Sequence, residues 1–274
     1  MSNQRTHYVT TTDGVTIGGT VHGQGRPLVF LQGAIGDGDI DWQAVVGHLA
    51  SRFTCHLPSM RGRGLSGDHP DLSFGRLVDD FLAYVDSIGE PTGLVGWSAP
   101  FALVAAAQSD AVDAVAYFES SMLSLMDEQE QAAVGDILAR TGGLAAEGRL
   151  ADAARAFAAF PFNDEEIALL EDAGYLEAAG RYVPNLLNHL QQVMEQGDPI
   201  ADPALLGAIS VPVLVLYGSD TKRLFAASAR AVTDRVPNAR RQEIPGAGHA
   251  GPLTHPEAIA EALTEFFSPT LQPA

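Results

Sequence analysis

The stretch that decides the fold is Thr92-Gly-Leu-Val-Gly-Trp-Ser-Ala-Pro-Phe-Ala-Leu-Val104. Residues 92–95 form a short run typical of a strand buried in a parallel sheet, and the Ala-rich segment 101–108 is typical of a helix. Gly96-Trp-Ser98-Ala-Pro100 lies between them. A serine on so sharp a turn from strand to helix is held in a strained conformation, close to the free N–H groups of the helix. The pentapeptide alone also fits a serine that caps a helix. Other parts of the chain are needed to distinguish a reactive serine from a capping one.

Strand and helix signals alternate on both sides of this stretch. The dipeptide Asp13-Gly14 predicts a hairpin between the first two strands. Strands are predicted over residues 8–12, 15–21, 27–31, 53–57, 92–95, 112–118, 213–217 and 241–244. Helices are predicted over residues 40–50, 74–88, 101–108, 224–236 and 256–267. This alternation predicts an α/β fold with a mostly parallel sheet of about eight strands flanked by helices.

Residues 121–206 interrupt the alternation. This segment has little strand character and is predicted to form several helices separated by Gly and Pro. It carries 15 acidic and 4 basic residues, a net charge of 4 − 15 = −11. We therefore expect three parts: the first part of the core over 1–120, a helical lid insertion over 121–206, and the second part of the core over 207–274.

Two further candidate residues follow the serine, each just after a predicted strand. Asp220 lies in Tyr217-Gly-Ser-Asp220, and His249 lies in Pro245-Gly-Ala-Gly-His249. Ser98, Asp220 and His249 then meet at the carboxyl ends of parallel strands, where α/β sheets place their sites. A serine hydroxyl needs a base to accept its proton, histidine suits that role near neutral pH, and a carboxylate orients the imidazole.

A second acid competes with Asp220. Glu119 directly follows the predicted strand 112–118, so it also lies at the carboxyl edge of the sheet. We favour Asp220 over Glu119 as the carboxylate that orients the histidine.

These motifs together resemble the α/β-hydrolase superfamily, over nearly the whole chain outside the insertion. The order Ser, acid, His matches, although Pro100 replaces the last glycine of the Gly-x-Ser-x-Gly pattern. Gln32-Gly33 stands where relatives often have His-Gly, and Ser59 replaces the aspartate of an Asp-x-Arg-Gly-x-Gly-x-Ser turn. The resemblance implies that Ser98 is the nucleophile, that His249 is its general base, and that the backbone N–H groups of Ala34 and Ala99 form the oxyanion hole.

The residues beside Ala34 and Ser98, and the lid implied by the resemblance, supply further candidates. Trp97, Ile35 and Phe160 are candidate pocket residues, and an acidic, aromatic lid favours neutral or apolar substrates. Asp37, Asp39 and Asp41 mimic the start of a calcium loop, but Trp42 and His48 occupy positions that require glycine and glutamate. We therefore expect no metal and no cofactor.

Composition restricts the partners. The net charge is −18 and the single lysine is Lys222, so a nucleic acid is not an expected partner. Residues 1–12 are polar and no apolar run is long enough to span a membrane, so we expect a cytoplasmic protein with a small-molecule substrate and no membrane association. Monomer and homodimer both remain open.

Two functions follow from the sequence. In the first, the chain is a serine hydrolase that cleaves a small neutral or apolar ester, lactone or thioester through an acyl-enzyme on Ser98. In the second, the departures at Gln32, Ser59 and Pro100 indicate a non-hydrolytic protein of the same fold: a cyclase, a lyase or a small-molecule binding protein.

Overall fold

The computed structural model describes residues 4–198 and 200–268. Its strands form an 8-stranded sheet in the order β1-β2-β4-β3-β5-β6-β7-β8. Strands β1 and β2 pair antiparallel with each other and β2 pairs antiparallel with β4, whereas all further neighbours are parallel. The strands are β1 (Arg5–Thr10), β2 (Thr16–Gly23), β3 (Arg26–Leu31), β4 (Phe53–Pro58), β5 (Thr92–Trp97), β6 (Val112–Phe118), β7 (Val213–Gly218) and β8 (Ala239–Ile244).

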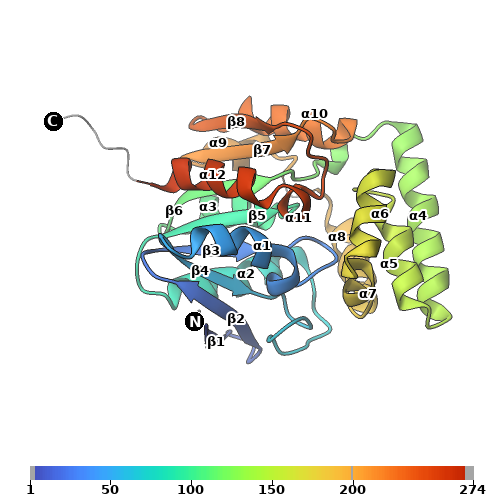
Figure 1. Ribbon diagram of the computed structural model, residues 1–274, viewed down its shortest axis with the longest axis horizontal. Helices are drawn as coiled ribbons and strands as arrows, with labels where there is room; N and C mark the ends of the chain where they lie inside the picture. Colours follow the sequence, from blue (N-terminus) through green and yellow to red (C-terminus); the bar gives the residue numbers. More distant parts are fainter. Residues whose placement is uncertain (1–3, 199, 269–274) are drawn as a thin grey trace.

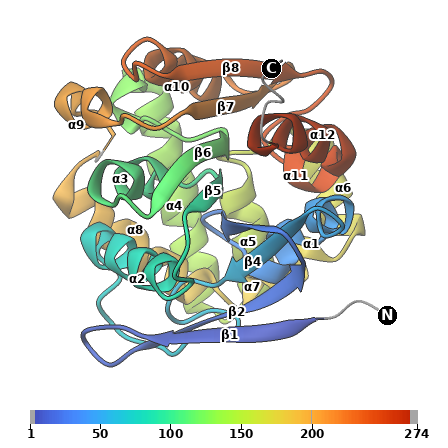
Figure 2. The ribbon, with the colours of Figure 1, turned by 90° about the vertical axis from the view of Figure 1, so that its left-hand side faces the viewer.

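Helices cover both faces of this sheet (Figure 2). One face packs on α1 (Gly38–Leu49), α11 (Gly251–Thr254) and α12 (Pro256–Phe267), through side chains such as Trp42 and Leu263. The other face packs on α2 (Phe74–Asp86), α3 (Phe101–Gln108), α9 (Pro203–Ala208) and α10 (Arg223–Thr233). Strands β4 and β5 are buried along their whole length, as expected for strands of a sheet that helices cover on both faces.

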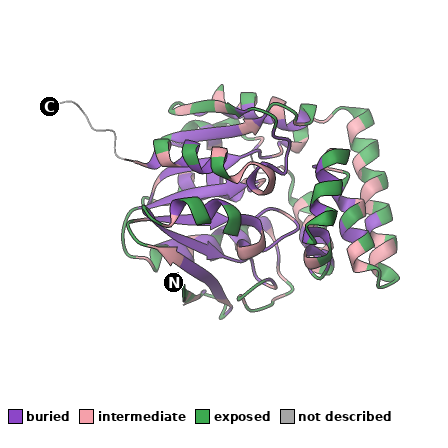
Figure 3. Cartoon of the chain, viewed as in Figure 1, coloured by how far each residue is buried: buried purple, intermediate pink, exposed green. Residues whose placement is uncertain are grey.

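A group of helices forms a separate layer beyond one end of the sheet (Figure 1). These lid helices are α4 (Glu128–Ala146), α5 (Leu150–Ala158), α6 (Asp164–Asp172), α7 (Tyr175–Gly180) and α8 (Val183–Gln196), preceded by a short 3₁₀ turn, Leu123–Leu125. Figure 3 shows that the strands are mostly buried while α4 presents exposed residues along its length. The lid therefore lies over the loops that leave the carboxyl ends of the parallel strands.

The predicted fold class is confirmed: the sheet is mostly parallel, has eight strands and is flanked by helices. The Asp13-Gly14 turn is also present, with Gly14 at φ 87° and β1 and β2 paired on either side. The expected end of the insertion at residue 206 falls inside α9, whose Leu206 is buried in the core cluster that includes Leu103 of α3. The helix α9 thus packs with the core, and the lid helices end at Gln196.

Candidate active site

Ser98 lies at the junction of β5 and α3 in a backbone conformation that side chains rarely adopt. Its φ is 52°, and its N–H donates to the carbonyl of Phe118 on the neighbouring strand (3.0 Å). Pro100 follows with φ −60° and ψ −18°, angles that proline adopts freely at the start of a helix. The departure at Pro100 is therefore accommodated, and the turn holds the serine side chain at the carboxyl edge of the sheet.

His249 lies in the loop between β8 and α11, and it is 3% exposed. Its ring is held on several sides by aromatic groups: it stacks on Phe225 with centroids 4.0 Å apart, and Phe162 lies 5.6 Å away. The indole N–H of Trp97 donates to the carbonyl of His249 (2.8 Å), which fixes the loop against β5. The imidazole therefore has little freedom to turn.

The carboxylate beside this histidine is Glu119. His249 Nδ1 lies 2.7 Å from Glu119 Oε2, so the Nδ1–H donates to the carboxylate and Nε2 is left as an acceptor. Two more donors hold the same carboxylate: the N–H of Gly218 (2.8 Å) and the hydroxyl of Thr221 (2.8 Å). Glu119 is completely buried and has φ 44°. Each carboxylate oxygen thus has a partner, as a buried charge requires.

The expectation that Asp220 orients His249 is corrected by this geometry. The side chain of Asp220 is exposed and accepts only from the hydroxyl of Ser219 (2.9 Å) among the described residues. Its N–H donates to the carbonyl of Ala247, which joins the loop after β7 to the loop after β8 and leaves the Asp220 side chain exposed. Glu119, which follows the neighbouring strand β6, occupies the position beside the imidazole instead. Its side chain is one methylene longer than that of aspartate and reaches His249 Nδ1. The donors Gly218 and Thr221 gave no signal in the sequence.

Backbone strain marks the same two positions. Among residues 4–198 and 200–268, Ser98 and Glu119 are the only non-glycine residues with positive φ. Each such residue costs about 1–3 kcal/mol and persists only where the surrounding structure enforces it. Strain of this kind concentrates at functional sites, so its restriction to the two candidate residues separates them from the other serines and acids of the chain.

Ala34 borders the same two cavities as Ser98, and Ala99 directly follows Ser98 in the chain. Neither backbone N–H donates a hydrogen bond to another described residue, although Ala99 is only 1% exposed. The loop that carries Ala34 is fixed by Gln32, which donates to the carbonyl of Gly36 (2.6 Å) and accepts from the N–H of Met60 (2.7 Å). Arg63 donates to the carbonyls of Ala34 and Gly36. Gln32 thus supports this loop with both ends of its amide.

A buried carboxylate also holds this loop. Asp41 is fully buried and accepts from the N–H of Gly33 (2.7 Å) and from the hydroxyl of Tyr175 on α7 (2.9 Å). Burial raises the pKa of Asp41 to about 7, and the hydrogen bonds from Gly33 and Tyr175 oppose that rise. Asp37 caps α1 by accepting from the N–H groups of Asp39 and Ile40, so the acidic triplet has structural partners.

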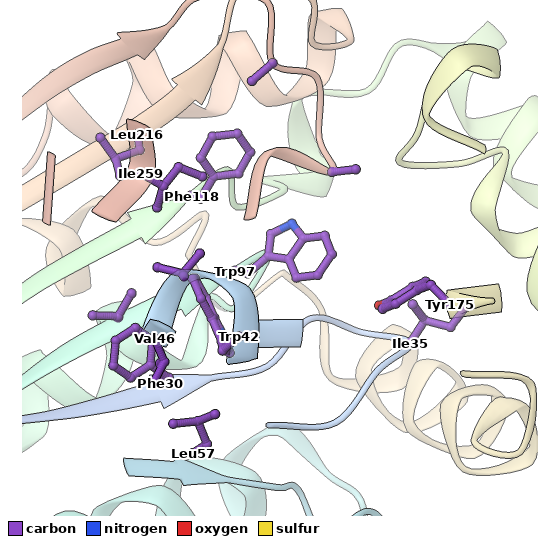
Figure 4. Close-up of a cluster of buried hydrophobic side chains, with 14 of the residues drawn as sticks. Phe30, Ile35, Trp42, Val46, Leu57, Trp97, Phe118, Tyr175, Leu216 and Ile259 are labelled. Atoms are coloured by element: carbon purple, nitrogen blue, oxygen red, sulfur yellow. The ribbon is translucent and has the colours of Figure 1, made fainter. Parts of the chain in front are cut away.

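Two cavities meet at Ser98. A small one of about 30 Å³ is bordered by Ile35, Trp97 and His249, and a large one of about 410 Å³ opens between the core and the lid. Ala34, Ser98, Phe157 and Phe160 line both. Figure 4 shows Trp97 beside the sheet, with Ile35 and Tyr175 on the lid side. The structure thus places the candidate pocket residues Trp97, Ile35 and Phe160 around Ser98. No hydrogen bond joins Ser98 Oγ to His249 in the described part of the chain; both border the small cavity.

One lid residue reaches the histidine loop and was missed by the sequence analysis. Glu166 of α6 accepts from the N–H of Ala250 (2.6 Å) and from the N–H of Asn163 (3.0 Å), the cap of its own helix. A Cβ on Gly248 would lie 2.5 Å from Glu166 Oε1. Glycine at position 248 therefore allows the lid carboxylate to approach. The Asn163-x-x-Glu166 capping box was readable in the sequence, but its contact with Ala250 was not.

We expect Glu166→Ala to lower both stability and turnover. The substitution removes two hydrogen bonds to a charged group, which are worth about 1.5–3 kcal/mol each, and it frees the loop that carries His249. Thermal melting and kcat/KM for an ester measure the two effects. Glu165→Ala is the matched control, because Glu165 is exposed in the same helical turn. Equal behaviour of the two variants would show that the contact with Ala250 does not hold the loop.

A strained serine between a parallel strand and a helix, together with a buried imidazole–carboxylate pair at the same edge of the sheet, is typical of the α/β-hydrolase class. A sequence profile described as "Alpha/beta hydrolase family" matches residues 21–262. The chain belongs to that family.

Individual relatives agree with this assignment. A solved structure described as an alpha/beta hydrolase from Sphaerobacter thermophilus has a TM-score of 0.80 and 27% identity, and covers 96% of this chain and 100% of its own. The 2-hydroxy-6-oxo-6-(2'-aminophenyl)hexa-2,4-dienoic acid hydrolase of Metapseudomonas resinovorans is 25% identical over 90% of this chain and 85% of its own. The pimeloyl-[acyl-carrier protein] methyl ester esterase of Chromobacterium violaceum is 28% identical over 89% and 94%.

None of the described helices has the length and apolar character needed to cross a membrane.

Proposed function

We propose that the chain is a serine hydrolase that cleaves a small neutral or apolar ester, lactone or thioester through an acyl-enzyme on Ser98. The observation that carries this proposal is that backbone strain occurs at the two residues to which the proposed reaction gives chemical roles. The non-glycine residues with positive φ in the described chain are a serine at a strand–helix turn and the glutamate that binds His249.

The proposed reaction assigns a role to each group. Ser98 Oγ attacks the carbonyl carbon while His249 Nε2 accepts the hydroxyl proton, and Glu119 stabilises the imidazolium. The N–H groups of Ala34 and Ala99 donate to the oxyanion, where one such donor is worth about 10²–10³ in rate. His249 then gives its proton to the leaving alcohol or thiol, so the bond from the carbonyl carbon to the leaving group breaks. Water, activated by His249, attacks the acyl-enzyme and releases the acid and the free serine.

The alternative from the sequence, a non-hydrolytic cyclase, lyase or binding protein, has one observation in its favour. Ser98 and His249 share a cavity without a hydrogen bond between them among the described residues. Catalytic hydrogen bonds are often long in structures without substrate and shorten in the complex. The fixed donors at Glu119 and the open N–H groups of Ala34 and Ala99 therefore favour the hydrolase.

Hydrolysis of p-nitrophenyl butyrate by the wild type and by His249→Gln tests the proposal. We expect the variant to lose about 10³-fold or more of kcat/KM, since a glutamine cannot accept and return the proton. Its amide can still donate to Glu119, which limits the loss of stability. Absence of turnover by the wild type across esters, lactones and thioesters would support the non-hydrolytic alternative. Equal, measurable rates for the two proteins would exclude His249 as the general base.

A further inference from the structure

The two cavities that meet at Ser98 differ more than tenfold in volume, about 30 Å³ against about 410 Å³. Given the proposed acyl-enzyme chemistry, on which this inference rests, the geometry points to an esterase for a long, uncharged acyl chain joined to a very small alcohol. The large cavity is then the acyl site and the small cavity is the site of the leaving group.

The position of His249 decides which part of the ester enters which cavity. The imidazole must protonate the leaving oxygen, so that oxygen lies within hydrogen-bond reach of His249. His249 borders the small cavity and not the large one. A cavity of about 10–15 Å³ by this measure holds one water molecule, so the small one takes a group of methanol size. After the alcohol leaves, the same space admits the attacking water.

The walls of the small cavity resist enlargement. Ile35 is 3% exposed and Trp97 is 2% exposed, and the ring of Tyr175 is fixed by its hydrogen bond to Asp41. Phe162 lies against both Trp97 and His249. A longer alkoxy group would have to displace packed, buried side chains, which costs typically about 1–3 kcal/mol.

The large cavity suits an apolar chain. Its wall is formed mainly by aliphatic and aromatic side chains of the core and of the lid helices α4 and α8, including Phe74, Phe101, Val134, Leu138, Leu190 and Val193. Each methylene moved from water into such surroundings favours binding about fourfold. The length of the acyl chain should therefore determine how tightly the substrate binds.

Charge in the large cavity excludes an anionic chain. No lysine or arginine lines it within the described residues, and Asp198 contributes a negative charge. His189 also borders it, but burial lowers the pKa of His189 to about 4, so this ring is neutral at pH 7. A carboxylate at the far end of the acyl chain would have no cation to pair with, and burying an unpaired charge is costly.

Phe160 and Phe157 lie where the two cavities meet, since both residues line both cavities. Phe160 is half-buried at the end of α5, where the carbonyls of Ala159 and Phe160 accept from Lys222 Nζ (2.6 and 3.0 Å). Its ring packs against the rings of Phe157 and Phe225, with centroids 6.2 Å apart in each pair, and lies at the boundary of the two cavities. Truncation of this ring should merge them and weaken the discrimination between acyl and alkoxy groups.

Isomeric esters test the inference with the whole protein. Methyl hexanoate and pentyl acetate have the same composition and differ in which side of the carbonyl carries the chain. We expect kcat/KM for methyl hexanoate to exceed that for pentyl acetate by about 10- to 100-fold, as burial of four methylenes allows. Methyl hydrogen adipate, with a carboxylate at the chain end, should be at least about tenfold poorer than methyl hexanoate. Acid release in a pH-stat measures all three.

Variants assign these preferences to the cavities. Phe160→Ala should bring the ratio for the two isomers towards one. Val134→Phe should lower the ratio of kcat/KM for methyl hexanoate to that for methyl acetate, while Ala133→Phe, at an exposed neighbouring position of α4, should leave that ratio unchanged.

Equal or faster hydrolysis of pentyl acetate, by a protein that still cleaves p-nitrophenyl butyrate, would overturn the cavity assignment alone. Faster hydrolysis of methyl hydrogen adipate than of methyl hexanoate would contradict the inference that the acyl chain is uncharged. Failure to cleave any ester, lactone or thioester would remove the proposed function and this inference with it.

Discussion

Ser98→Ala is expected to lower kcat/KM for an ester by about 10⁴- to 10⁶-fold, the range seen when the nucleophile of a Ser-His-acid site is removed. The alanine keeps the Cβ and therefore the backbone strain at φ 52°. Its fold and melting temperature should stay close to those of the wild type. Steady-state hydrolysis and thermal melting measure the two properties on the same preparation.

Ser98→Gly is the matched variant, since it removes the hydroxyl and also the Cβ that makes this φ costly. Glycine adopts positive φ readily, and the strain is worth about 1–2 kcal/mol before the greater entropy of the unfolded glycine chain is subtracted. We expect it to be as inactive as the alanine variant but to melt about 1–3 °C higher. Retained turnover in either variant would exclude Ser98 as the nucleophile, and a lower melting temperature for the glycine variant would show that the turn is unstrained.

Glu119→Gln should cost about 10²- to 10⁴-fold in kcat, because an amide cannot stabilise the imidazolium and can hold the imidazole in the wrong tautomer. The variant is isosteric, and its oxygen can still accept from Gly218 or Thr221. Asp220→Asn is the matched control: the same carboxylate-to-amide change at an exposed residue should alter kcat by less than about twofold.

The opposite pattern, with Asp220→Asn inactive and Glu119→Gln active, would mean that the loop after β7 rearranges to bring Asp220 to His249 during turnover. Equal losses would mean that both acids serve. Measurement of kcat at saturating substrate separates these outcomes from changes in substrate binding.

Much of the fold could be predicted because its signals are local. Buried runs such as β5, the Asp13-Gly14 hairpin and the amphipathic helix α2 each depend on residues close together in the sequence. The order of Ser98 and His249 along the chain, each after a strand, placed both at the same edge of the sheet.

The acid was not predictable in the same way, because two carboxylates follow neighbouring strands. The choice between them depends on the turn after β7 and on the reach of the Glu119 side chain to His249, which are properties of the folded chain. The two cavities at Ser98 and the contact of Glu166 with Ala250 are formed by segments far apart in the sequence. A local sequence pattern therefore could not predict them. The end of the insertion at residue 206 stays a prediction; α9 is helical like the helices before it but packs on α3.

The structure accommodates all three departures from the family pattern that motivated the non-hydrolytic alternative. Gln32 bridges Met60 and Gly36, and Ser59 accepts from the N–H of Gly38 (3.2 Å). Pro100 adopts the angles that the first turn of α3 requires. These substitutions therefore preserve the local geometry around Ser98. A catalytic site requires that geometry, whereas a site that had lost its activity would not.

Covalent labelling by a fluorophosphonate tests the central claim most directly, because the probe reacts with a serine hydroxyl only where a base and oxyanion donors activate it. Intact mass and peptide mapping should show one adduct per chain, on Ser98, that is lost in Ser98→Ala and strongly reduced in Glu119→Gln. An adduct on another serine, or ester turnover by a wild-type protein that the probe never labels, would contradict the account.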